Sequence, residues 1–281
     1  MDTKLLLIEG IPGSGKSTIS KRIHAYLEEK GIRSQLFNEG DLHPADLAWH
    51  ACVPAGEFAD LLAKHPGDRE AVMRQTTMEE DYAIVAYTHI DTDNQELRRL
   101  LETYEVYDNR VPFERFGELH LQRWERFARS AAAEVGITLF ECAFLQNHIN
   151  ELLLFQLADE SAILAYMSRL LTTVLALNPV LLYLSQPDVR GTIEKVGDVR
   201  VNAQGEKEWL NACIAYIERS PFGKNRGLRG IEGSIAYFEQ RKASELALLS
   251  KLPLTSYVVK NAERNWEKVW DEIRGILDRA I

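Results

Sequence analysis

The chain has 281 residues, of which 46% are hydrophobic and 27% are charged. This balance is typical of a globular protein and excludes a disordered, fibrous or collagen-like chain. The formal net charge of −9 argues against bulk binding to nucleic acid or to an anionic membrane, so an anionic ligand must find a local positive site.

Cysteine usage and hydropathy indicate a reducing compartment. The three cysteines, Cys52, Cys142 and Cys213, lie far apart and show no CxxC spacing, which predicts neither a disulfide framework nor a zinc site. The first apolar run covers only residues 5–8, too short for a signal peptide or a membrane span. We therefore expect a soluble, cytoplasmic protein without a membrane partner.

The first 45 residues predict a strand, a glycine-rich loop, a helix and a second strand. Residues 4–9 form a nearly continuous apolar run, as in a strand buried on both faces of a parallel sheet. From Lys16, apolar residues recur at helical spacing until Gly31, which is a stop signal. Residues 34–38 are a second strand, and Gly40 and Pro44 mark its exit into a loop.

Residues 45–135 are too long for an ordinary crossover between strands, and we interpret them as a helical insertion between strands 2 and 3. Their pattern predicts a strand at 82–87, a polar helix at 95–104 and a clearer helix with an apolar face between Phe113 and Ala131.

The rest of the chain alternates strands with helices. Strands are predicted at 137–145, 180–184 and 255–259, and helices at 149–177, 209–217, 235–249 and 266–277. Such alternation implies right-handed crossovers and a parallel sheet. The prediction is an α/β fold with a five-stranded parallel sheet, in a single domain that covers residues 1–281.

The segment 10–18, GIPGSGKST, fits the pattern G-x-x-x-x-G-K-[ST] and lies between a strand and a helix, as this motif requires. Its glycines let successive backbone N–H groups point at phosphate oxygens, and the helix N-terminus adds partial positive charge. Lys16 would reach the β- and γ-phosphates, and the Ser17 hydroxyl would coordinate Mg²⁺. The expected nucleotide-binding residues are Gly10, Pro12, Gly13, Ser14, Gly15, Lys16, Ser17 and Thr18.

This segment resembles the Walker A motif of P-loop NTPases, and the chain resembles their small-molecule kinase branch, which includes gluconate, shikimate and nucleoside kinases. The shared motifs cover residues 1–45 and the strand around Glu141, whereas the rest is similar only in its βα rhythm. The resemblance implies a doubly wound sheet, ATP with Mg²⁺, and a small-molecule phosphate acceptor at the carboxyl ends of the strands. It also implies that the insertion binds the acceptor, for which Tyr107, Arg110, Arg123 and Trp124 are candidates, although an apolar stripe like that of Trp124 is more typical of a core.

The segment 40–44, GDLHP, resembles the turn after the second strand of gluconate-kinase-like members. Phosphoryl transfer to an alcohol needs a carboxylate that orients the hydroxyl and takes its proton. Asp41 is the predicted base and Glu39 the alternative. Asp41 could instead only bond its own backbone before Pro44, and His43 is expected to pack within the turn.

Glu141 interrupts the apolar strand 137–145, so we expect it to be buried beside a cation, a metal-bound water or a hydrogen-bond donor. Its position resembles that of the Walker B acid, although the family commonly has Asp there. We predict that Glu141 joins Ser17 at Mg²⁺, while a role toward the acceptor and a structural salt bridge both stay open. Gln146, Asn147 and His148 follow, as acceptor contacts or as a helix cap.

Residues 219–233 are interpreted as a lid. The stretch 219–242 holds six basic and two acidic residues in an acidic chain, and its glycines would give mobility. The resemblance implies that lid arginines neutralise charge on the transferred phosphoryl group, which makes Arg226 and Arg229 predicted catalytic residues beside Lys16 and Asp41. Arg190 and Arg200 compete for this role, and a solvated basic loop without a catalytic role stays open.

The sequence thus favours a kinase that transfers the γ-phosphoryl group of Mg-ATP to a hydroxyl of a metabolite, nucleoside or antibiotic-like compound. Asn261 and Arg264, after the last strand, are expected to touch the adenine or to cap a helix. The alternative is a regulatory NTPase or switch without a phosphorylated product, although no guanine-reading N-K-x-D segment is present. A protein that holds nucleotide only as a structural element is a third interpretation. No nucleic-acid partner is expected, and an oligomer is not indicated.

Overall fold

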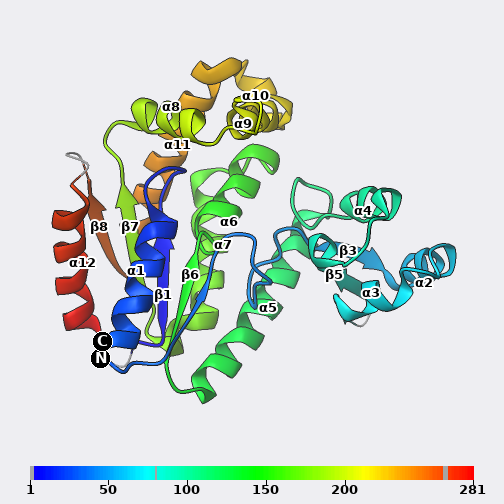
Figure 1. The fold of residues 1–281 in the computed structure, drawn as a ribbon, viewed down its shortest axis with the longest axis horizontal. Helices are drawn as coiled ribbons and strands as arrows, with labels where there is room; N and C mark the ends of the chain where they lie inside the picture. The colour runs from blue at the N-terminus through cyan, green and yellow to red at the C-terminus, as the bar shows by residue number, and fades with distance from the viewer. Residues whose placement is uncertain (1–2, 80, 262–264) are drawn as a thin grey trace. The chain divides into compact units, whose positions relative to one another are not determined.

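The computed structural model describes residues 3–79, 81–261 and 265–281. Two compact units are present: the first consists of Met1–Glu39 with Trp124–Ile281, and the second is Gly40–Arg123. The first unit carries the phosphate loop (Figure 1).

The first unit is built on a five-stranded parallel sheet. Its strands are β1 (Leu5–Glu9), β2 (Ser34–Phe37), β6 (Ile137–Glu141), β7 (Val180–Ser185) and β8 (Thr255–Lys260), in the order β2-β6-β1-β7-β8. The chain turns to opposite sides of β1, so the carboxyl end of β1 is a topological switch point, where ligands of such sheets bind. The predicted α/β fold with a doubly wound, parallel five-stranded sheet is confirmed.

Alternate residues of the central strands face opposite sides of this sheet. Leu6 and Ile8 belong to a core shared with α1 (Lys16–Glu29) and α12 (Trp266–Ala280). On the other face, Phe140 contacts Trp124 of α5 (Phe113–Ala133) edge to face, with ring centroids 5.7 Å apart. Because both faces are covered, the strands are continuous apolar runs, the pattern that made them predictable.

The Leu-rich stretch predicted as helical at 149–177 consists of separate segments. They are α6 (Gln146–Asn150), the π-helical η2 (Glu151–Phe155), α7 (Glu160–Val174) and the short η3 (Leu175–Leu177). Leu157 has a positive φ of 51°, and the Asp159 side chain caps α7 by accepting from the Ala162 N–H. The stretch that its composition predicts to be one helix is thus divided, and Asp159 caps the start of its longest segment.

One stretch of this region, Glu160–Leu177, has the length and mean hydropathy (1.3) of a membrane span. This is weak evidence, because the core helix of a soluble protein passes the same test. In α7, a single stripe of apolar side chains is buried, and it includes Ile163, Met167 and Leu170.

Between β7 and β8 the chain forms four helices: α8 (Val189–Val199), α9 (Glu208–Arg219), α10 (Pro221–Arg226) and α11 (Gly230–Leu249). Helices α8 to α10 lie beyond the carboxyl ends of the strands (Figure 1). The predicted lid 219–233 is therefore largely helical. Ser220 caps α10 and Pro221 begins it, and Gly223 is needed for packing, since a Cβ atom there would lie 1.9 Å from the Ile217 carbonyl oxygen.

The second unit has its own sheet and core. It contains the strands β3 (Ala51–Pro54), β4 (Thr76–Met78) and β5 (Tyr82–Val85), the helices α2 (Ala55–Lys64), α3 (Arg69–Arg74) and α4 (Gln95–Glu102), and the 3₁₀ turn η1 (Tyr87–His89). The strands pair antiparallel in the order β3-β5-β4. The strand at 82–87 and the helix at 95–104 were predicted. The strands β3 and β4 were not predicted: β3 ends in Pro54, and β4 has only three residues, two of them threonines.

Candidate nucleotide-binding site

The phosphate loop connects the carboxyl end of β1 to the N-terminus of α1. Gly13 and Gly15 adopt left-handed φ angles of 78° and 93°, which cost glycine little. The Ser14 N–H donates to the Ile11 carbonyl over 3.2 Å. Within the described part of the chain, the N–H groups of Gly13 and of residues 15–18 meet no acceptor. These donors at a helix N-terminus form a site for an anion.

Two side chains of the loop are buried among these donors. Lys16 is 6% exposed, and its Nζ donates to the carbonyl oxygens of Gly10 (2.9 Å) and Ile11 (3.1 Å). The Ser14 hydroxyl is buried and has no hydrogen-bond partner among the described residues. A buried polar atom without a partner is costly, and a phosphate oxygen would supply the missing one. The loop therefore fits a nucleotide polyphosphate.

Ser17 and Glu141 bring two oxygen atoms together beside this loop. Glu141 ends β6, which pairs with β1, and its side chain is 3% exposed. The Ser17 hydroxyl donates to Glu141 Oε1 over 2.5 Å. Of the three partners that the sequence left open for this carboxylate, a cation, a metal-bound water or a hydrogen-bond donor, the structure shows a hydrogen-bond donor. A hydroxyl and a carboxylate are the kinds of oxygen that Mg²⁺ binds, so these two residues fit the predicted metal site.

Groups from α8, from α12 and from the segment after β7 cover the loop. A Cβ atom on Gly13 would lie 2.2 Å from Cγ2 of Val196 in α8, and one on Gly15 would lie 2.2 Å from the indole ring of Trp266. Gln186, directly after β7, donates to the Ser14 carbonyl over 3.5 Å. Larger residues would not fit at these glycines. Of the two segments considered as a lid, α8, which carries Arg190, contacts the loop.

A second carboxylate of the first unit follows strand β2. Glu39 Oε1 accepts from Gln146 Nε2 over 2.9 Å, and Glu39 Oε2 lies 3.8 Å from the Cys142 sulfur. Since Cys142 directly follows Glu141, Glu39 belongs to the same end of the sheet. Asp41, the predicted base, is exposed and belongs to the second unit. Within the first unit, the carboxylate beside β6 is that of Glu39, which the sequence offered as the alternative base.

Glu9 is a buried carboxylate that sequence reasoning missed. Its Oε1 accepts from the N–H groups of Phe144 (2.8 Å) and Leu145 (2.9 Å), and its Oε2 accepts from that of Gln146 (3.2 Å). Burial raises the pKa of Glu9 to about 7, although these three donors favour the ionised form. The available signal was a glutamate closing an apolar strand directly before the glycine loop.

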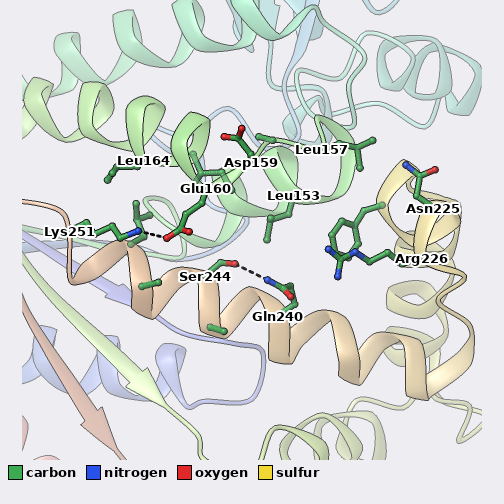
Figure 2. A pocket seen from close by; sticks show the side chains of 16 residues that line it. Leu153, Leu157, Asp159, Glu160, Leu164, Asn225, Arg226, Gln240, Ser244 and Lys251 are labelled. Atoms are coloured by element: carbon green, nitrogen blue, oxygen red, sulfur yellow. Dashed lines mark hydrogen bonds and ion pairs between the residues drawn. The ribbon is translucent and has the colours of Figure 1, made fainter.

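The side chains of the predicted lid arginines have contacts away from the loop. Arg226 lies over the Phe222 ring at 4.5 Å, and Arg229 donates to the Leu228 carbonyl over 2.8 Å. Figure 2 shows Arg226 in the wall of a cavity of about 570 Å³, which Leu153 and Gln240 also line. A catalytic role for these two arginines stays a prediction.

The competing arginine Arg190 lies in the first turn of α8 and forms a bidentate bridge to Glu232 of α11, with distances of 2.7 and 2.6 Å. Both side chains are exposed. This bridge raises the pKa of Arg190 and lowers that of Glu232. Arg200 lies over the Trp209 ring, 5.2 Å from its centroid.

The residues considered for the acceptor pocket have different surroundings. Trp124 is fully buried in the core of the first unit, as its apolar stripe suggested. In the second unit, Tyr107 is buried and donates to Asp46, Arg110 bonds the Glu102 carbonyl, and Arg123 donates to the His43 carbonyl over 2.8 Å.

Of the residues considered for the adenine, Asn261 directly follows β8. Asn261 is buried, and its N–H donates to the Ser185 carbonyl over 3.3 Å. Arg264 lies outside the described residues.

One fold is defined by three successive parts at the switch point of a parallel sheet. They are a strand, a glycine loop lined by backbone amides that holds a buried lysine, and a helix. The chain has a P-loop NTPase fold.

One family model matches the N-terminal part of the chain, which includes the phosphate loop. The family model described as chromatin associated protein KTI12 matches residues 3–51. No curated protein matches the chain.

Among the solved structures that match the chain are two kinases, each aligned over most of its length. A deoxyadenosine kinase from M. mycoides with bound dATP has a TM-score of 0.41 and 14% identity, over 98% of this chain and 100% of that one. A thymidylate kinase from Candida albicans has a TM-score of 0.44 and 12% identity, over 99% of this chain and 92% of that one.

Proposed function

We propose that the protein is a kinase that transfers the γ-phosphoryl group of Mg-ATP to a hydroxyl of a small molecule. The observation that carries this proposal is the group of polar side chains around the phosphate loop. Lys16, the Ser17–Glu141 pair and Glu39 all belong to the first unit, where the strands of the parallel sheet end. The net charge of −9 favours a small-molecule partner over a nucleic acid or a membrane.

The chain's own groups would bind the nucleotide. Bound ATP would supply the phosphoryl group, with Mg²⁺ neutralising its negative charge. The loop N–H groups and the Ser14 hydroxyl would donate to phosphate oxygens. Lys16 would exchange its bonds to the loop carbonyls for the phosphates, and Ser17 and Glu141 would hold the cation.

A carboxylate must orient the acceptor hydroxyl and take its proton as the new P–O bond forms. We assign this role to Glu39, which Gln146 holds beside strand β6. Asp41 is the second candidate, because its segment resembles the corresponding turn of gluconate-kinase-like proteins.

A cation should neutralise charge on the transferred group. We assign it to Arg190, because α8 contacts the loop and the exposed bridge to Glu232 is cheap to break. Arg226 and Arg229 are the alternatives.

The test is a panel of metabolites, nucleosides and antibiotic-like compounds assayed for ADP release. With an active acceptor, we expect Glu39→Gln to lower kcat by about 10²- to 10⁴-fold, while Glu57→Gln, at an exposed carboxylate of α2, has no effect. A loss in Asp41→Asn instead would reassign the base. Arg190→Gln compared with Arg226→Gln locates the cation in the same way. ATP turnover that no compound accelerates would contradict the kinase proposal.

A regulatory NTPase is the second candidate, and the match of residues 3–51 to a family described as chromatin associated favours it. Such a protein would hydrolyse ATP slowly whatever metabolite is added. The same panel therefore separates the two functions, with ADP release that depends on an acceptor supporting only the kinase.

A further inference from the structure

Arg241 is a fully buried arginine of α11 that sequence analysis counted only as part of a basic stretch. Its side chain is 1% exposed. Nε donates to Glu245 Oε1 over 2.8 Å, and Nη1 donates to Asn150 Oδ1 over 3.2 Å. Glu245 accepts a second bond from the Tyr183 hydroxyl over 2.6 Å. The guanidinium group is thus fixed from several sides.

The Nη2 atom of Arg241 reaches the start of the phosphate loop, where it donates to the Gly10 carbonyl over 3.2 Å. The same oxygen accepts from Lys16 Nζ over 2.9 Å. A carbonyl oxygen has two lone pairs and can accept both bonds. Among the described residues, Lys16 and Arg241 are the side chains that donate to this buried carbonyl. When Lys16 turns toward a phosphate, the bond from Arg241 remains. Without Arg241 the carbonyl would be left unpaired, which is costly.

Arg241 also determines how the Gln146 side chain is oriented. Nη2 lies 3.4 Å from Gln146 Oε1, and Gln146 Nε2 donates to Glu39 over 2.9 Å. Because a guanidinium can only donate, the amide oxygen must face Arg241 and the amide nitrogen must face Glu39. One guanidinium therefore supports the loop that binds the nucleotide and the carboxylate assigned as base.

We propose that Arg241 is a positioning residue for phosphoryl transfer: it keeps the Gly10 carbonyl bonded while Lys16 moves to the nucleotide, and it orients Gln146 toward Glu39. This inference rests on the proposed function, because it assigns no ligand of its own.

The first experiment measures Mg-ATP binding by titration calorimetry on the full chain. Removing Arg241 alone would leave the Glu245 carboxylate buried without its cationic partner, so the test variant is Arg241→Met with Glu245→Gln, which keeps an acceptor for Tyr183. We expect the Kd to rise about tenfold, which corresponds to one charge-assisted hydrogen bond. The matched control is Tyr183→Phe, which removes a bond of the same buried network without touching Gly10, and its Kd should change less than twofold.

A double-mutant cycle with Lys16→Met separates positioning from general destabilisation. If Arg241 acts by releasing Lys16, the Arg241→Met/Glu245→Gln pair should change the Kd less than twofold in a chain that already carries Lys16→Met. A tenfold change that persists there would show distortion of the loop and overturn the inference. An unchanged Kd in the first experiment would overturn it too.

These outcomes are distinct from failure of the proposed function. If the unsubstituted chain does not bind Mg-ATP at all, the kinase proposal fails and the positioning role falls with it. If the chain binds Mg-ATP and the Arg241 variant binds it equally well, only the positioning role is wrong.

Discussion

The two compact units use buried polar groups in different ways. In the first unit, Lys16 and Arg241 converge on the Gly10 carbonyl, next to backbone N–H groups that meet no acceptor among the described residues. In the second unit, the Tyr107 hydroxyl donates to Asp46 over 2.6 Å and lies 3.0 Å from His120 Nε2. The first arrangement offers donors to a ligand, whereas in the second the bonds run between the unit's own side chains.

A second buried pair of the second unit also forms its hydrogen bond within the unit. The Tyr87 hydroxyl donates to Glu105 over 2.6 Å, and burial raises the pKa of Glu105 to about 8. Burial also lowers the pKa values of His43 and His50 to about 4, so both imidazoles are neutral near pH 7. Glu105 Oε1 has no hydrogen-bond partner among the described residues, but the other carboxylate oxygen is held by a side chain of the same unit. Buried polar groups that bond one another help to specify a fold. We therefore expect substitutions in the first unit to change ligand binding and those in the second to change stability.

Lys16→Met should have the largest effect. Because the ammonium group would hold the β- and γ-phosphates, we expect kcat/KM for ATP to fall about 10³-fold, with little change in the free energy of unfolding. Lys21→Met, at an exposed position of the same helix, is the control and should behave like the unsubstituted chain. Full ATP turnover by the Lys16→Met protein would contradict the site assignment.

Tyr107→Phe should change stability and leave nucleotide binding unchanged. It leaves buried Asp46 without the hydroxyl donor, which should lower the free energy of unfolding by about 1–3 kcal/mol in urea titrations. The Kd for Mg-ATP should stay the same. A weaker Kd with unchanged stability would mean that the hydroxyl serves nucleotide binding, and the contrast between the units would fail.

Glu105→Gln should change how stability depends on pH. The folded state keeps the Glu105 proton up to about pH 8, whereas the unfolded state loses it near 4.5, so this carboxyl lowers stability as the pH rises through that window. As the pH rises through this window, the free energy of unfolding of the glutamine variant should increase relative to that of the unsubstituted chain, by about 1.4 kcal/mol per pH unit. Glu102→Gln, at an exposed position, should show no such gain. Parallel stability curves for the Glu105→Gln and unsubstituted proteins would contradict the raised pKa.

Arg190→Gln should have the smallest effect on stability. It removes an exposed bridge to Glu232, and such bridges contribute little, so the thermal midpoint should hardly move. A large drop in the midpoint would show that the bridge holds α8 and α11 together, which would make Arg190 a structural residue.

Much of the fold was predictable because its signals are local. Continuous apolar runs marked β1, β6 and β7, and the GIPGSGKST segment marked the loop. The lid was less predictable, because Pro221 and Gly227 mark the start and the end of a helix as well as a mobile loop. Glu141 was expected to be buried beside a cation, a metal-bound water or a hydrogen-bond donor, and to join Ser17 at Mg²⁺. In the structure the Ser17 hydroxyl, 124 residues away in sequence, donates to it, and the metal role stays a prediction.

The sequence by itself determined the strand-loop-helix unit that presents backbone N–H groups to a phosphate, because spacing and glycine content act within a few residues. Only the tertiary structure decided which side chains surround that unit. It brought Glu39 beside strand β6, Val196 against Gly13 and Arg241 onto the Gly10 carbonyl. These contacts depend on strand order and on helix packing between residues distant in sequence, which no local pattern records.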